Sequence, residues 1–179
     1  WGDNGVALCD DTSGQSSPTI ASDGAGGAIV TWLDSRNSVI DIYAQRVDAA
    51  GTPQWTDDGV ALCTVLGAQY NPMIASDGAG GAIVTWYDYR GPSIDIYAQR
   101  VSAAGAAQWA AGGVALCTNE NYQYYPMIVS DGAGGAIVAW TDDRNTYPIH
   151  NIYAQRVNSA GATQWTTDGV SLQAVTSNQ

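Results

Sequence analysis

Residues 72–117 read PMIASDGAGGAIVTWYDYRGPSIDIYAQRVSAAGAAQWAAGGVALC, and the chain repeats this stretch. Trp1, Trp55, Trp109 and Trp165 are spaced by 54, 54 and 56 residues, and Trp32, Trp86 and Trp140 form a second series. The six positive charges are arginines with the same period, as Arg36, Arg90 and Arg144 and as Arg46, Arg100 and Arg156. The chain therefore holds three copies of one unit and part of a fourth. Features that all copies share are expected to belong to the scaffold.

Each unit is predicted to form four short strands. In the quoted copy, strands are expected at 72–76, where a proline opens the strand, at 81–86 and at 95–101. A fourth strand is expected from Gln108-Trp109 through 113–117, with a bend at Gly112-Gly113. The Asp-Gly-Ala-Gly segment at 77–80 is typical of a tight turn, because its glycines can adopt positive φ. No segment has the spacing of an amphipathic helix.

The predicted strands are apolar on both faces. Ala82, Val84 and Trp86 face one way, and Ile83 and Thr85 face the other. A sheet with one face in water would alternate apolar and polar residues. These sheets are therefore expected to be covered on both sides.

The predicted fold is all-β, with three four-stranded antiparallel blades of β-propeller type and an extra terminal strand. The predicted units are a partial repeat at 1–17 that forms the outer strand of a blade, blade 1 at 18–71, blade 2 at 72–125, and blade 3 with a terminal strand segment at 126–179. A β-sandwich is the alternative, but it leaves the near-identity of the copies unexplained. Propellers have about four to eight blades, so three blades are expected to belong to a larger array or an oligomer. Strand donation between chains would lead to a filament.

The repeat resembles a known family. Its order of Pro-x-Ile-Ala-Ser-Asp-Gly, Ala-Ile-Val-Thr-Trp-x-Asp-x-Arg and Ile-Tyr-Ala-Gln-Arg-Val is similar to the NHL-like blades of secreted bacterial β-propeller repeat proteins. The resemblance implies binding, scaffolding or adhesion more often than catalysis. Sialidase-type Asp-boxes are a poor match, because the segment around Ser22-Asp23-Gly24 lacks their Ser-x-Asp-x-Gly-x-Thr-Trp spacing.

Composition narrows the classes of partner. The net charge of −11 disfavours nucleic acids and anionic lipids. No apolar run approaches the roughly 20 residues that span a bilayer. The chain opens on Trp1 without a visible signal peptide, so it is interpreted as a mature or excised segment of an extracellular or cell-surface protein. Self-association, neighbouring repeats and glycans are the expected partners.

Each cysteine, Cys9, Cys63 and Cys117, closes a Gly-Val-Ala-Leu-Cys segment. Equivalent positions in adjacent repeats are expected to lie beyond the roughly 7 Å Cα separation that a disulfide allows. The cysteines are therefore interpreted as small buried thiols.

Two interpretations are open for the repeated carboxylates. No cofactor is required, but Ca²⁺ is a candidate, with ligands from Asp34, Asp41, Asp88, Asp95 and Asp142, together with the turn residues Asp23, Asp77 and Asp131. The favoured interpretation is structural pairing with arginine. Arg46, Arg100 and Arg156 lie inside apolar strands and each need an acid, and Asp34, Asp88 and Asp142 are the predicted partners. Alternatively, arginines converging on a propeller axis would bind a carboxylated ligand.

The sequence shows no catalytic constellation, so the chain is predicted not to be an enzyme. His150 is the only histidine and is interpreted as a surface-loop residue. A sialidase- or glycosidase-type hydrolase is the least favoured class, because Glu120 is the only glutamate and no carboxylate pair stands apart from the repeat.

The positions that differ between copies carry the remaining functional signal. They become rich in tyrosine in the later copies: Tyr70, Tyr87, Tyr89, Tyr122, Tyr124 and Tyr125. These rings are predicted ligand-binding residues suited to sugars, although drift after duplication explains the variation as well. The chain is predicted to be a repeat module with a structural, assembly or adhesive role, and the assembly role includes filament formation. The alternative is a multivalent carbohydrate-binding propeller.

Overall fold

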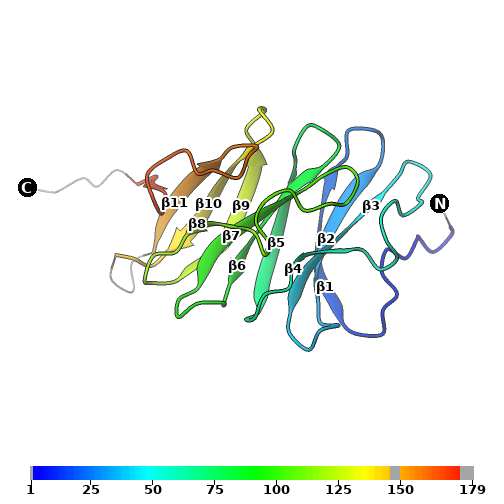
Figure 1. Cartoon of the computed structure of the whole chain (residues 1–179), viewed down its shortest axis with the longest axis horizontal. Helices are drawn as coiled ribbons and strands as arrows, with labels where there is room; N and C mark the ends of the chain where they lie inside the picture. Colours follow the sequence, from blue (N-terminus) through cyan, green and yellow to red (C-terminus); the bar gives the residue numbers. More distant parts are fainter. Residues whose placement is uncertain (1, 146–149, 174–179) are drawn as a thin grey trace, which may run out of the picture.

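The computed structural model describes residues 2–145 and 150–173, and all regular secondary structure in these residues is β-strand (Figure 1). The strands are β1 (Gln15–Ser22), β2 (Ala28–Asp34), β3 (Asp41–Val47), β4 (Val60–Cys63), β5 (Gln69–Ser76), β6 (Ala82–Asp88), β7 (Asp95–Val101), β8 (Val114–Cys117), β9 (Gln123–Ser130), β10 (Ala136–Asp142), β11 (Asn151–Val157) and β12 (Val170–Ser171). The prediction of an all-β chain is confirmed.

The strands form three antiparallel four-stranded sheets, as predicted. Sheet A contains β1–β4, sheet B contains β5–β8 and sheet C contains β9–β12, each as a simple meander in chain order. The sheets share one register, in which the tryptophan of the second strand pairs with the tyrosine of the third: Trp32 with Tyr43, Trp86 with Tyr97, and Trp140 with Tyr153. The sequence repeat therefore produces the same strand pairing in each of the three sheets.

The sheets stack face to face in the order A, B, C along the long axis of the molecule (Figure 1). Ile29 and Ile42 of sheet A pack with Val84 and Trp86 of sheet B, and the opposite face of sheet B, which carries Ile83, packs on sheet C. The first strands β1, β5 and β9 make most of the contacts between neighbouring sheets, whereas the fourth strand β4 makes few with β7. Both faces of sheet B are covered, which accounts for its two-sided apolar pattern.

The first strand of each sheet begins before its proline, which corrects the prediction that Pro72 opens the strand. β5 starts at Gln69, whose backbone N–H donates to the Ile40 carbonyl of sheet A at 2.9 Å. The register with β6 slips between Tyr70 and Met73. Proline has no N–H to donate, and the bulge accommodates it without ending the strand. The residues at the bulge, Ser17, Asn71 and Tyr125, have φ values of 52, 55 and 53°.

A tryptophan in each second strand holds the fourth strand of its own sheet. The indole N–H of Trp86 donates to Asp88 at 2.8 Å, and its ring reaches Gly113, the residue before β8. A Cβ added at Gly113 would lie 2.8 Å from the Trp86 ring and 2.7 Å from the Ala98 carbonyl oxygen. The same contact joins Trp32 to Gly59 and Trp140 to Gly169. The glycine before each fourth strand is thus required by the tryptophan.

We expect Gly113→Ala to lower the free energy of unfolding by about 2–4 kcal/mol, since it combines positive φ with a steric clash. Gly78→Ala is the matched control, because its φ is also positive but no atom lies within 4 Å of the added Cβ. The control should lose about 1–2 kcal/mol from φ alone. Urea unfolding followed by tryptophan fluorescence measures both, and equal losses would contradict the role of Trp86.

Candidate functional site

The positions that vary between copies meet at one edge of the stack, where the first strand of each sheet begins and the second ends. We call this the variable edge, and the β2–β3 and β6–β7 connections mark it at the bottom of Figure 1. Its equivalent positions are Ser16, Leu33 and Ser35 in sheet A, Tyr70, Tyr87 and Tyr89 in sheet B, and Tyr124, Thr141 and Asp143 in sheet C. The same backbone therefore presents three different sets of side chains.

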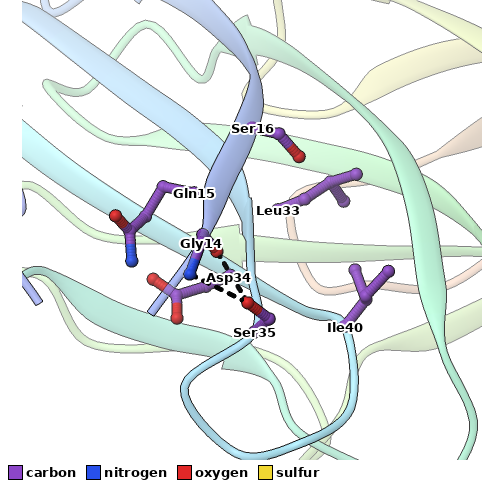
Figure 2. A pocket seen from close by; sticks show the side chains of 7 residues that line it. All are labelled: Gly14, Gln15, Ser16, Leu33, Asp34, Ser35 and Ile40. Atoms are coloured by element: carbon purple, nitrogen blue, oxygen red, sulfur yellow. Dashed lines mark hydrogen bonds between the residues drawn. The ribbon is translucent and has the colours of Figure 1, made fainter. Parts of the chain in front are cut away.

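At sheet A the variable edge is hollow, as Figure 2 shows. The pocket of about 170 Å³ is lined by Gly14, Gln15, Ser16, Leu33, Asp34, Ser35 and Ile40. The Ser35 hydroxyl accepts from the Gly14 N–H at 3.1 Å and donates to the Gly14 carbonyl at 2.9 Å. The serines leave open the space that tyrosines occupy at the equivalent positions of sheet B.

At sheets B and C the variable edge carries a continuous tyrosine cluster. It consists of the six predicted residues, Tyr70, Tyr87, Tyr89, Tyr122, Tyr124 and Tyr125, whose neighbouring ring centroids lie 5.6–6.3 Å apart. The Tyr87–Tyr125 contact joins the two sheets in an edge-to-face geometry. Aromatic pairs prefer such arrangements. The structure thus brings all six residues together, and their role in binding stays a prediction.

A second pocket opens within the tyrosine cluster. It has a volume of about 330 Å³ and is lined by Tyr89, Gly91, Pro92, Ser93, Ile94 and Tyr122. The exposed fractions of Tyr89, Tyr122 and Tyr125 are 45%, 50% and 64%. Ser93 is buried and donates its hydroxyl to Asp95 at 2.7 Å. Exposed aromatic rings beside a small hollow make this the strongest candidate for a ligand site.

Sheet C adds a polar group that the sequence did not single out. Asp143 accepts a hydrogen bond from the Tyr124 hydroxyl and contacts the His150 imidazole. Burial, and then the neighbouring Asp143 carboxylate, raise the pKa of Tyr124. His150 is half-exposed, and it replaces the isoleucine that precedes the third strand at Ile40 and Ile94. That replacement, together with Asp143 in the place of Ser35 and Tyr89, was the signal available in the sequence.

The predicted partners of the strand arginines were wrong. Arg46, Arg100 and Arg156 pair with the turn residues Asp23, Asp77 and Asp131, each at 2.8 Å. Asp34, Asp88 and Asp142 instead pair with Arg36, Arg90 and Arg144 at 2.6 Å. The register decides this, because Ile29 at the start of β2 lies opposite Arg46, whereas Asp34 is at the other end of β2. The two kinds of ion pair therefore lie at opposite ends of the strands in each sheet.

The turn carboxylates are saturated by protein groups. One Asp23 oxygen accepts the N–H groups of Ala25 and Gly27 at 2.8 and 2.9 Å, and the other accepts Arg46. The hydrogen bond from Ala25, helped by those from Arg46 and Gly27, holds the pKa of Asp23 below its ordinary value of 3.8. Together these contacts close the Asp-Gly turn over the arginine.

The carboxylates predicted to bind calcium do not form a cluster. Asp34 lies opposite Asp41, and Asp88 lies opposite Asp95, as pairs only. Within 2–145 and 150–173, no group of three or more His, Cys, Asp or Glu side chains is placed to hold a metal. Calcium prefers six to eight oxygen ligands. Calcium binding therefore stays a prediction without a cluster to support it.

Burial raises the pKa of the Cys63 thiol to about 11 and that of Cys117 to about 12. Both are buried, and Cys9 is half-buried; all three are free thiols. The thiol is therefore the dominant form at neutral pH, and a nucleophilic thiolate is disfavoured.

Comparison with protein-family models gives no matching family, and comparison with curated proteins gives no match. The resemblance to NHL-like blades thus stays a prediction. The described residues contain no helix that could span a membrane.

The buried Asp34 gives a prediction for pH dependence. Burial acts to raise its pKa, but hydrogen bonds from Arg36 and Trp32 outweigh burial and lower it below 3.8. A lowered pKa contributes stability that is present above pH 3.8 and is lost as the pH falls through the folded-state pKa. Asp34→Asn should therefore cost about 2 kcal/mol at pH 7 and progressively less below pH 3.8. Urea unfolding across this range measures the difference. Asp57→Asn, at an exposed carboxylate in the β3–β4 connection, should have little effect throughout.

Proposed function

We propose that this chain is a non-enzymatic, secreted or cell-surface repeat module of β-propeller type that acts by assembly. Its end sheets stack against further copies in the way that its own sheets stack against one another. The close approach of β1, β5 and β9, with few contacts at β4, supports a fan of blades rather than a flat sandwich.

The observation that carries this proposal is a comparison of equivalent side chains. Ile42 and Ile96 are 0% exposed because the next sheet covers them, but Ile152 of sheet C is 40% exposed. Leu62 and Leu116 are buried at 3% and 2%, whereas Leu172 is 58% exposed. Met127 and Val129 add further exposed apolar area on β9, and Val129 lies opposite Ile137. We call this surface the C face.

The opposite end of the stack presents the matching surface. Ala82 and Val84 of sheet B and Ala136 and Val138 of sheet C are 0% exposed beneath the preceding sheet. Their equivalents in sheet A, Ala28 and Val30, are only partly buried, and Ile20 beside Val30 is 67% exposed. We call this surface the N face. Burying one such aliphatic side chain contributes about 1.5–3 kcal/mol, so pairing of the C face with the N face of a second copy is favourable.

A mixing experiment tests stacking. Wild-type protein should show concentration-dependent association by size-exclusion chromatography with light scattering. Ile152→Asp, which disables the C face, and Ile20→Asp, which disables the N face, should each be monomeric at 18.7 kDa. Mixed in equal amounts, they should form a dimer that grows no further, because each supplies the face that the other lacks.

The control is Leu66→Asp, which changes an even more exposed apolar residue in the β4–β5 connection and should behave as wild type. A wild-type chain that stays monomeric at high micromolar concentration, or a mixture that never dimerises, would contradict the proposal.

A second candidate function, carbohydrate binding, is favoured by the tyrosine cluster. Small-molecule sites combine an apolar lining with a few polar groups in a hollow of roughly 300 Å³ or more, and the pocket beside Tyr89 and Tyr122 reaches about 330 Å³. Ser93 lines this pocket. Asp143, which contacts His150, donates its backbone N–H to the carbonyl of the lining residue Tyr122 at 3.0 Å.

On a glycan array, protein presented multivalently should bind a subset of neutral glycans, and Tyr89→Ala with Tyr122→Ala should reduce the signal at least tenfold. Trp165→Ala removes an exposed ring outside the cluster and should leave binding unchanged. Silence of the wild-type protein across the array would remove this candidate.

A further inference from the structure

We infer that residues 5–9 of one copy form the fourth strand of sheet C in a second copy, where they replace residues 169–173. The inference rests on the proposed stacking and names the segment that completes the interface. The two segments are equivalent in the repeat, and they read Gly-Val-Ala-Leu-Cys and Gly-Val-Ser-Leu-Gln.

The first observation is how residues 5–9 are held. The Cys9 thiol lies 3.3 Å from the Arg36 guanidinium and 4.0 Å from Asp34, and the Asp10 N–H donates to Asp58 at 2.8 Å. At the junction between sheets B and C, the Cys117 thiol lies 3.2 Å from Arg144 and 4.0 Å from Asp142, and the Thr118 N–H donates to Asp168 at 2.9 Å. Residues 5–9 thus contact sheet A in the way that β8, the fourth strand of sheet B, contacts sheet C. They occupy the place of a fourth strand from a sheet that would precede sheet A.

The second observation is that this attached segment is not paired as a strand. Val60–Cys63 pairs with β3 and Val114–Cys117 pairs with β7, each as a strand of four residues. The equivalent residues 6–9 are in no strand of the described chain. Backbone N–H and C=O groups that lie outside a strand ladder are available to pair with another strand.

The third observation is that the matching strand of sheet C is short. β12 contains only Val170 and Ser171, paired with Ala154 and Tyr153, against four residues in β4 and β8. Gln173 stands where the other copies have cysteine, so the thiol–arginine contact that joins adjacent sheets is missing from this segment. Replacing it with residues 5–9 restores both the length of the strand and its cysteine.

Stacking makes the exchange necessary. When the C face of one copy meets the N face of the next, the attached residues 5–9 arrive beside β11, and the two segments compete for one place. In the exchanged state, Val6 takes the pairing of Val170 with Ala154, and Ala7 takes that of Ser171 with Tyr153. Cys9 then lies opposite Ile152, as Cys63 lies opposite Ile42 and Cys117 opposite Ile96.

A disulfide trap tests this pairing. Residues directly opposite in an antiparallel pair have Cα atoms about 4.5–5.5 Å apart, within the range of roughly 4.4–6.8 Å that a disulfide accepts. Ile152→Cys, treated with a mild oxidant such as copper–phenanthroline, should convert most of the 18.7 kDa chain into a ladder of multiples on a non-reducing gel. Peptide mass spectrometry should identify a bond between Cys9 and the new cysteine.

Two variants serve as controls. Adding Cys9→Ser to Ile152→Cys should abolish the ladder, and Ala162→Cys, exposed in the β11–β12 connection, should give none. A bond between two cysteines at position 152, or a Cys9–152 bond within a single chain, would overturn the exchange.

The outcomes separate the two proposals. A dimer in the Ile20→Asp and Ile152→Asp mixture without the Cys9 cross-link would leave stacking standing and overturn strand exchange. Absence of both dimer and cross-link would overturn the proposed function and the exchange together.

Discussion

Each sheet of this chain depends on a neighbour to cover its apolar faces. A four-stranded sheet that is apolar on both sides exposes too much hydrophobic area to be stable alone. Sheet B has a neighbour on each side, and Ile83 and Trp86, which point to opposite faces, are both fully buried. Sheets A and C each leave one such face uncovered, so the same physical requirement that builds the stack also generates the surfaces proposed for assembly.

Ion pairs and hydrogen bonds reinforce that stack at both ends of its strands. At one end, Asp34 binds Trp32 and Arg36, and at the other Asp23 closes a turn over Arg46. The arginines also reach neighbouring sheets, since Arg46 donates to the Ala103 carbonyl at 3.3 Å. Because these carboxylates are engaged by the protein itself, they belong to the scaffold.

The variable edge shows how much can change on a constant backbone. The bulge keeps nearly the same φ in all three copies, while its residue changes from serine to asparagine to tyrosine. Leu33, Tyr70 and Tyr87 of this edge still pack against the core, whereas Tyr89, Tyr122 and Tyr125 are exposed. A pocket, a tyrosine cluster and an aspartate–histidine contact thus occupy equivalent places on one backbone. Strand ends and loops lie at the surface and accept such change more readily than the strand interiors do.

The sequence alone determined the period, the strands, the turns and the positions that vary, because each depends on neighbouring residues and on repetition. It did not determine that Arg46 pairs with Asp23, that Tyr87 meets Tyr125 across two sheets, or that Ile152 is exposed while Ile42 is not. Those facts depend on strand register and on which sheet covers which face. Identical side chains at equivalent positions contact different neighbours, and only the tertiary structure determines which neighbours those are.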